Sequence, residues 1–196
     1  MDIRLPDSVA LPPAQTQGGM PLMSALAARR SVRAFSQRPL EAQLLSNLLW
    51  AAGGINRADG GGRTAPSAHN WREIEIYVAQ ADGLSSYHPL THSLRHESRR
   101  DLRAESGVQD FVATAPLNLI YVADLARVDA IDPVERRFYC AADAAFCAQN
   151  VYLFCASAGL ACVVRGVVNR RALAQSMELG LRQRVILAQT VGYPAV

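Results

Sequence analysis

The segment from Arg29 to Arg33 places three guanidinium groups and one hydroxyl within five residues, directly after a predicted helix. The polar side chains of this segment are Arg29, Arg30, Ser31 and Arg33. Forked guanidinium donors beside a hydroxyl can hold a phosphate through charge-assisted hydrogen bonds. The same residue types also describe a solvated basic turn, and composition alone favours that second interpretation.

A second candidate is the run Arg63-Thr64-Ala65-Pro66-Ser67-Ala68-His69-Asn70. Pro66 restricts the backbone, while Ser67 and Asn70 are small side chains that both donate and accept hydrogen bonds. Groups of this kind suit the edge of a flat heterocycle, where the chain must approach closely. An ordinary surface loop is the default interpretation of such a run.

The third candidate begins at Gly159-Leu160 and passes through a predicted strand to Arg165-Gly166. A glycine at the end of a strand lets a backbone N–H approach a ligand without a side chain in the way. This feature alone does not indicate a ligand site, and it supports one only together with the first two candidates.

Other chemistries have little support. His88, His92 and His96 are four residues apart, which on a helix would align three metal ligands, but Pro89 interrupts that helix, and we expect exposed or substrate-facing histidines and no metal site. The chain has no G-x-S-x-G, no P-loop and no G-x-G-x-x-G at a strand-to-helix turn. Hydrolase, P-loop and Rossmann sites are therefore not predicted.

Composition bounds the class of protein. The chain has 196 residues, is 50% hydrophobic and carries a net charge of +3, and its cations are arginines. This composition indicates a folded domain and argues against a disordered chain or an electrostatic nucleic-acid binder. Cys140, Cys147 and Cys155 follow a helical spacing and are expected to be small buried side chains on one helix face.

Two segments resemble targeting or membrane sequences only superficially. The N-terminus lacks a basic start followed by an apolar run, so no secretory signal is predicted. The 21 residues from Ala144 to Val164 carry no charge, but Gln149 and Asn150 lie within them and Ala158-Gly159 marks a helix end. We expect a buried helix followed by a strand in a soluble, cytoplasmic protein with no membrane partner.

The elements expected along the chain give an α+β fold. Residues 1–20 are predicted to be an extended arm, and residues 21–196 a single domain. Helices are expected at 21–29, from Pro39 to Gly53-Gly54, at about 134–158 and after Asn169, with two short helical patterns within 93–114. Strands are expected at 74–79, 117–124, 160–164 and 185–193, with a long loop at 53–71. The order favours α+β over a doubly wound sheet.

Taken together in this order, the motifs resemble those of the FMN-dependent nitroreductase family. Four segments carry the resemblance, which covers about residues 20–194: Arg29-Arg30-Ser31-x-Arg33-x-Phe35, Pro66-Ser67-Ala68-x-Asn70, Gly159-Leu160 through Arg165-Gly166, and Val191-Gly192-Tyr193-Pro194. The branch with R-x-x-P-S-A before a strand is the most similar, and it includes azoline-forming dehydrogenases of peptide tailoring. Trp71-Arg72-Glu73 stand where many members have Gln-Pro-Trp.

The resemblance implies a central, mainly antiparallel sheet flanked by helices, in a domain-swapped type of homodimer with tightly bound FMN at the subunit interface. By analogy, Arg29, Arg30, Ser31 and Arg33 of one subunit would hold the phosphate and the polar edge of the ring. Pro66, Ser67, Ala68 and Asn70 would reach the same flavin from the partner, and Val164, Arg165 and Gly166 would lie beside flavin N5. His69, Trp71 and Tyr87 are guesses for the substrate side.

The implied activity is hydride transfer from NAD(P)H through FMN N5 to a nitroaromatic, a quinone or a similar acceptor in a ping-pong cycle. The flavin would carry the chemistry, so no catalytic side chain is predicted. Arg165, or another arginine, would replace a phosphate contact that many members take from a basic segment after the last strand, or flavin binding would be weaker. The alternatives are an FMN-dependent dehydrogenase or oxidase of the azoline-oxidising type, and a flavin-binding protein without catalysis.

Overall fold

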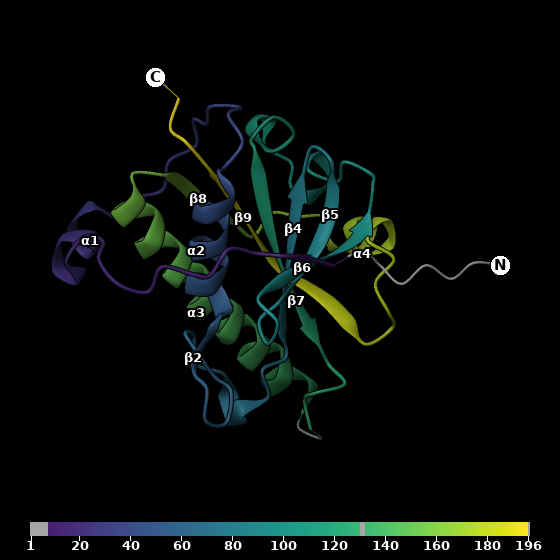
Figure 1. Ribbon diagram of the computed structural model, residues 1–196. Helices are drawn as coiled ribbons and strands as arrows, with labels where there is room; N and C mark the ends of the chain where they lie inside the picture. Colours follow the sequence, from purple (N-terminus) through teal and green to yellow (C-terminus); the bar gives the residue numbers. More distant parts are fainter. Residues whose placement is uncertain (1–7, 130–131, 196) are drawn as a thin grey trace.

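The computed structural model describes residues 8–129 and 132–195, and its centre is one antiparallel sheet (Figure 1). The strand order is β1-β6-β5-β4-β7-β9-β8, and every neighbouring pair in it is antiparallel. The strands are β1 (Ser8–Ala10), β4 (Ile74–Gln80), β5 (Gly83–His88), β6 (Ser93–Ser98), β7 (Leu117–Asp124), β8 (Ala161–Arg165) and β9 (Gln183–Gly192). A separate hairpin joins β2 (Ile55–Arg57) to β3 (Gly62–Arg63).

Four α-helices flank the sheet within the described residues: α1 (Leu22–Ala28), α2 (Ala42–Gly53), α3 (Pro133–Ala158) and α4 (Arg170–Ser176). Local chemistry sets their ends. The Asp132 side chain accepts a hydrogen bond from the Val134 N–H, with Pro133 at the first helical position, and Gly159 ends α3 in the left-handed conformation at φ +68°. The Asn169 side chain likewise caps α4 by accepting from the Ala172 N–H.

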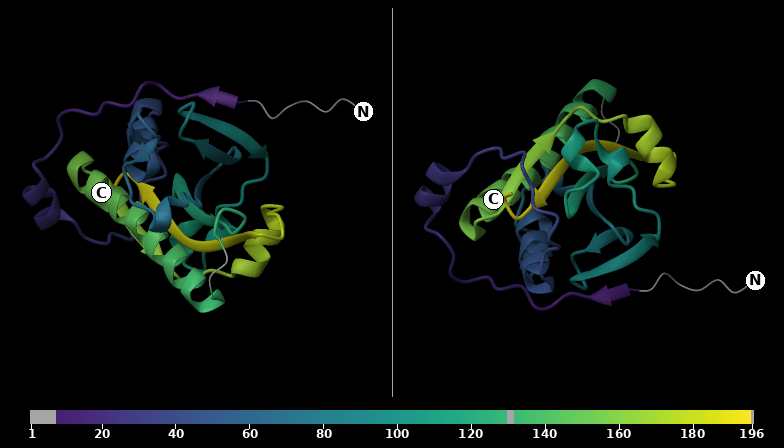
Figure 2. Two further views of the ribbon diagram at one scale, coloured as in Figure 1. Left: turned by 90° about the horizontal axis from the view of Figure 1, so that it is seen from below. Right: turned by 90° about the horizontal axis from the view of Figure 1, so that it is seen from above.

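Apolar side chains cover both faces of the sheet. On one face, α2 and α3 pack their leucines, alanines and cysteines against β4, β7 and β8, and Leu48, Leu49 and Val151 are fully buried there. On the other face, Leu173 of α4 packs with Leu84, Ile120 and other buried residues of the sheet. Figure 2 shows the long helix α3 crossing one side of the sheet and α1 lying at the periphery, beside the end of α3 and away from the sheet. The sheet with α3 is thus the frame on which the three candidate segments are placed.

The structure confirms the α+β class, the antiparallel sheet and most of the expected elements. The helices at 21–29, 134–158 and after Asn169 are present, and all four expected strands are found. The second helix begins at Ala42, later than Pro39, and ends at Gly53 as expected. Cys140, Cys147 and Cys155 are buried on α3, as their spacing predicted.

The expectation for 93–114 is wrong in its first part. Ser93–Ser98 form strand β6, which pairs with β1 on one side and β5 on the other, and only the single turns Ala104–Ser106 and Asp110–Val112 around Gly107 are helical. His88 therefore lies on β5, His92 in the following turn and His96 on β6, so the three histidines are not on a helix. Short, polar strands of this kind depend on their neighbours, which a local pattern does not reveal.

The segment before α1 lies against the rest of the chain. Residues 8–10 form β1, and the Leu11 N–H donates to the His92 carbonyl (3.0 Å). The Ser46 hydroxyl of α2 donates to the Pro12 carbonyl, and the Met20 N–H donates to the Ser157 hydroxyl of α3 (2.7 Å). No helix among the described residues combines the length and the apolar character that crossing a membrane requires.

Candidate functional site

The segment that contains Arg29–Arg33 is fixed by backbone hydrogen bonds to the far edge of the sheet. The Val32 N–H donates to the Cys162 carbonyl of β8 (2.9 Å). Beyond the arginines, Phe35 forms a β-bridge with Pro194, and the Ser36 N–H donates to the Tyr193 carbonyl (2.9 Å). The first, third and fourth motif segments therefore converge at this edge of the sheet, whereas the second segment lies elsewhere.

Tyr152 of α3 joins the first and third segments. Its hydroxyl lies 2.8 Å from the Ser31 hydroxyl and accepts a 2.8 Å hydrogen bond from the Val164 N–H. The Arg29 guanidinium stands over the Tyr152 ring, 5.3 Å from its centroid. A neutral side chain thus holds the arginine segment against the end of β8. We call Arg29, Arg30, Ser31 and Arg33, together with Tyr152 and residues 164–166, the arginine region.

The cations of the arginine region are not neutralised by the protein. Arg29, Arg30 and Arg33 form no salt bridge with any described residue, and Arg30 and Arg33 are exposed. A cavity of about 220 Å³ opens here, lined by Arg30, Val32, Tyr152 and Gly159 among others. Three unpaired guanidiniums beside a hydroxyl and a cavity fit a bound phosphate group.

The Arg165 side chain does not belong to this cationic surface. Its guanidinium is turned into the core, where it donates to the Ser106 carbonyl (2.5 Å), the Asn118 side-chain oxygen (2.9 Å) and the Thr190 hydroxyl (3.1 Å). Burial lowers the pKa of Arg165 to about 10. The expectation that this arginine could replace a phosphate contact is therefore not supported. Only the backbone of Arg165 remains at the site, next to the exposed Gly166, whose α-carbon faces open space.

The second segment forms a strained loop that is anchored by carboxyl groups. His69, Asn70 and Arg72 have φ of 48°, 56° and 53°, a conformation that residues other than glycine rarely adopt. The Ala68 N–H donates to Asp143 Oδ2 of α3 (2.8 Å), and the Arg72 N–H donates to the Ser67 hydroxyl (2.8 Å). These bonds hold the loop in one conformation.

Glu73 and Asp143 are two buried acids beneath this loop. Glu73 is 0% exposed and Asp143 is 2% exposed, and the Ser67 hydroxyl donates to Glu73 Oε2 (3.3 Å). Burial, and then the charge of Asp143, raise the pKa of Glu73 to about 7. Burial and these acids also raise the pKa of Cys140 to about 11 and that of Cys147 to about 12. We call the loop 66–72 with Glu73 and Asp143 the carboxyl region.

Aromatic side chains gather beside the carboxyl region. The rings of His69 and Trp71 stack with centroids 4.6 Å apart, and both meet Tyr139 of α3 edge-on at 5.9 Å. Two of the three substrate-side guesses, His69 and Trp71, are therefore neighbours. Tyr87 is not part of this aromatic group: it is buried on β5, where it lines a cavity together with Ser67 and Glu73, and its hydroxyl lies 2.9 Å from His92 Nδ1.

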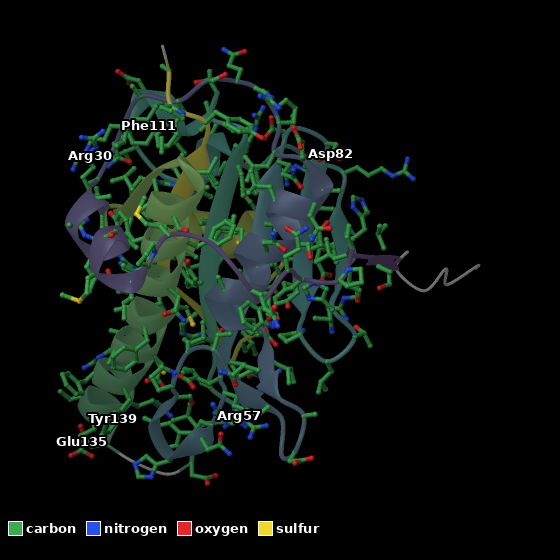
Figure 3. The ribbon with its side chains drawn as sticks, turned by 60° about the vertical axis from the view of Figure 1, so that its left-hand side comes forward. Arg30, Arg57, Asp82, Phe111, Glu135 and Tyr139 are labelled. Atoms are coloured by element: carbon green, nitrogen blue, oxygen red, sulfur yellow. The ribbon has the colours of Figure 1, made fainter. Side chains whose placement is uncertain are left out.

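The arginine and carboxyl regions lie apart along α3. Asp143 anchors one region and Tyr152 the other, and their nine-residue separation corresponds to about 14 Å along a helix. Figure 3 shows the same separation, with Arg30 near one end of α3 and Tyr139 near the other. One chain therefore does not bring the predicted ring-edge residues to the predicted phosphate residues.

Sequence reasoning missed Tyr152, Glu73 and Asp143. Asp143 had a usable signal, because it is the acid that directly precedes the 21 uncharged residues of the α3–β8 segment. An acid on an apolar helix face must find a polar partner when it is buried. Tyr152 and Glu73 carry no comparable signal in the sequence.

An α+β sheet of this order, flanked by α2, α3 and α4, is the fold of the nitroreductases. The sequence model of the nitroreductase family matches residues 26–193 of this chain. The chain belongs to the nitroreductase family.

Individual relatives agree with this assignment. A protein of Methanocaldococcus jannaschii named "Putative nitroreductase MJ1384" is 31% identical over 202 residues, which are 98% of this chain and 96% of the relative. A crystal structure described as "a putative nitroreductase" from Ralstonia eutropha JMP134 is 48% identical with a TM-score of 0.92, over 96% of this chain and 90% of that one. A chain of the Escherichia coli microcin synthetase McbBCD complex shares the fold at 17% identity, with a TM-score of 0.74 over 96% of this chain and 78% of that one. Family and fold together support a flavin-dependent oxidoreductase.

Proposed function

We propose that this protein is an FMN-dependent oxidoreductase that takes electrons from NAD(P)H and passes them to a nitroaromatic, a quinone or a similar acceptor. The observation that carries the proposal is the arginine region. There, three guanidiniums without acidic partners among the described residues lie within one five-residue segment, and Arg30 of that segment lines a cavity beside β8, in a chain of the nitroreductase family. The family generally uses FMN with NAD(P)H.

Residues of the arginine region would hold FMN by its phosphate and by one side of its ring. Arg29, Arg30 and Arg33 would pair with the phosphate, and Ser31 is already oriented by Tyr152. The backbone of Val164, Arg165 and Gly166 would lie beside N5, where the missing side chain of Gly166 leaves room. When bound, FMN supplies the two-electron chemistry by accepting hydride at N5 and delivering it to the acceptor.

A homodimer would complete the site. Pro66, Ser67, Ala68 and Asn70 would reach the polar edge of the flavin ring from the partner subunit, because within one chain they lie too far from the arginine region. The outer face of α3 supports this proposal, since Val134 (63% exposed), Phe138 (68%) and Phe146 (47%) present an apolar surface to solvent. Exposed apolar patches on helices mark subunit interfaces.

The acceptor would bind beside the aromatic group of the carboxyl region. His69 is exposed and stacked on Trp71, so a flat ring could extend this stack. Tyr87 is less suitable for direct contact, because its hydroxyl is bonded to His92 inside the fold. No side-chain acid or base is required for hydride transfer. The cytoplasmic location of the protein stays a prediction.

The test is the visible spectrum of the purified protein, followed by anaerobic addition of NADPH and of NADH. The proposal predicts a yellow protein that one or both donors bleach at once. A yellow protein that neither donor bleaches would favour a dehydrogenase that passes substrate electrons to oxygen, or a flavin-binding protein without catalysis. A colourless protein that does not take up added FMN would refute the proposal.

A further inference from the structure

A second, larger cavity lies in the carboxyl region where two strands separate. Pairing between β4 and β5 includes Tyr77 with Ser86 but does not continue to Ile76, so Ile74–Ile76 pair with β7 alone. The space between the separated strands is closed by the segment that leads into the 66–72 loop. The resulting cavity has a volume of about 360 Å³, which is enough for a small organic molecule.

Arg63 is a cation on the cavity wall that has no acidic partner among the described residues. Its Nη1 donates to the Gly53 carbonyl (2.9 Å), whereas its Nε is buried and has no hydrogen-bond partner. The side chain forms no salt bridge with any described residue. The Nε edge of a guanidinium is one of the edges that bind a carboxylate in a bidentate pair, so a strong donor is left without a partner here.

The other arginines on the wall increase the positive potential at Arg63. Arg127 is paired with Glu75 (2.9 Å) and Arg95 with Glu97 (2.7 Å), but Arg72 donates only to neutral oxygens, those of Asn70 and Gly60. Burial, and then the charges of Arg72 and Arg127, lower the pKa of Arg63. An anion bound at Arg63 would relieve both the desolvation and the repulsion.

The remaining wall suits an organic body more than an inorganic ion. Ile74, Ile76 and Leu90 contribute apolar surface. Glu73, Glu75 and Asp143 also line the cavity, but Glu73 is 0% exposed and Asp143 is 2% exposed, so these two carboxyl groups lie behind the surface that a ligand would touch. An unpaired guanidinium edge therefore borders one partly apolar cavity.

We propose that this cavity binds a small organic carboxylate, whose charged end pairs with the free edge of Arg63 and whose body packs against the separated end of β4. The site is distinct from the arginine region, because it includes none of residues 29–33. One chain forms the whole cavity, and Pro66 and Ser67 on its wall are residues that the proposed function assigns to the flavin of the partner subunit, so the carboxylate site would lie next to that flavin.

The experiment is isothermal titration of the purified protein with benzoate and with benzamide, its uncharged analogue. We expect benzoate to bind at least about 10-fold more tightly than benzamide, and Arg63→Gln to weaken benzoate about 10- to 100-fold. Arg57→Gln is the matched control, because it removes the same charge from the same hairpin at an exposed position outside the cavity. Equal affinities for the two probes, or benzoate binding that Arg63→Gln leaves unchanged, would overturn the proposal.

A crystal soaked with 4-bromobenzoate keeps the proposal testable if Arg63→Gln does not fold. An anomalous bromine peak between β4 and the 63–67 segment would support the site, and a peak elsewhere or none would overturn it. Steady-state assays then distinguish two sources of such a ligand. Competition with the electron acceptor would identify the carboxylate as a feature of the substrate, whereas inhibition without competition would identify a separate effector.

Discussion

The arginine region and the carboxyl region are built in opposite ways. In the arginine region the charges are unpaired and two of the three are exposed, and neutral groups do the positioning, chiefly the Tyr152 hydroxyl and backbone hydrogen bonds to β8. In the carboxyl region the charges are buried and do the positioning themselves, because Asp143 and Glu73 hold the 66–72 loop. The first arrangement keeps charge available for a ligand, and the second uses charge to fix a strained backbone.

This difference predicts different sensitivities. Exposed guanidiniums are screened by salt, so ligand binding in the arginine region should depend on ionic strength. Buried carboxyls respond to protonation, so the stability of the carboxyl region should depend on pH. Four variants test this contrast, and each is compared with the wild type or with a matched substitution.

The largest effect is expected for Glu73→Gln as a function of pH. The pKa of Glu73 is raised from 4.5 to about 7, so the folded state holds this proton more tightly than the unfolded state does. As pH rises from about 4.5 to about 7, wild-type protein should lose up to about 3 kcal/mol that the glutamine variant keeps. Asp143 of α3 faces this carboxyl and disfavours its charge, whereas Cys140 and Cys147 stay neutral over this range because their own pKa values are raised to about 11 and about 12.

Urea unfolding of both proteins between about pH 4.5 and about pH 8 measures this difference. The two stability curves should diverge with rising pH in favour of Glu73→Gln and then run parallel above the upper pKa. Curves that stay parallel over the whole range would mean that Glu73 does not titrate differently in the folded state.

Asp143→Ala and Asp143→Asn separate the hydrogen bond of Asp143 from its charge. Both remove the negative charge, but asparagine keeps an oxygen that can accept from the Ala68 N–H. We expect the alanine variant to be less stable than the asparagine variant by about 1–2 kcal/mol in chemical denaturation at pH 6. Equal stability of the two would show that the bond to Ala68 contributes nothing to the loop.

Tyr152→Phe tests the positioning in the arginine region. It removes the hydroxyl that contacts Ser31 and accepts from the Val164 N–H, so it should cost about 1 kcal/mol of stability and weaken flavin binding a few-fold. Tyr139→Phe, on the same helix, is the control, because Tyr139 makes ring contacts that survive the change. An equal loss of stability and of flavin affinity in both variants would show that the Tyr152 hydroxyl has no positioning role of its own.

The smallest effect is the salt dependence of flavin affinity. Raising ionic strength from about 0.05 M to about 0.3 M should weaken flavin binding about three-fold, because the arginines are exposed. Arg30→Ala should reduce this dependence, and Arg57→Ala should leave it unchanged. Flavin affinity that is insensitive to salt in the wild type would contradict the assignment of the phosphate to these arginines.

Much of the fold was readable from the sequence because its principal elements carry their own signals. Helix α3 has Asp132-Pro133 at its start and Gly159 at its end, and β7 and β9 are apolar runs between polar segments. The strands β1, β2, β3, β5 and β6 were missed, since short polar strands are defined by partners far away in the chain. Strand β6 is an example, because Ser93–Ser98 alternate little in polarity and the strand pairs with β1 on one side and with β5 on the other.

For the site, sequence motifs located the segments but not the contacts that hold them. The closeness of Ser31 to Val164 depends on Tyr152, which nothing local distinguishes from any other helix tyrosine. The direction of the Arg165 side chain depends on Ser106, Asn118 and Thr190, which lie on three other parts of the chain. Contacts between residues that lie far apart in the chain cannot be predicted from the spacing of residues within a motif.

The central claim is that a flavin site combines the arginine region of one subunit with the carboxyl region of its partner. Two variants test it: Arg29→Ala/Arg33→Ala in one chain, and Pro66→Glu/Asn70→Asp in the other, both at positions near the surface. Each variant alone should lose flavin as a homodimer.

Co-expression of the two variants with different affinity tags yields mixed dimers whose flavin content can be measured directly. The account predicts one flavin per mixed dimer, because one site then receives both unaltered regions and the other receives neither. Mixed dimers without flavin would contradict it, since that result requires both regions of a site to come from the same chain.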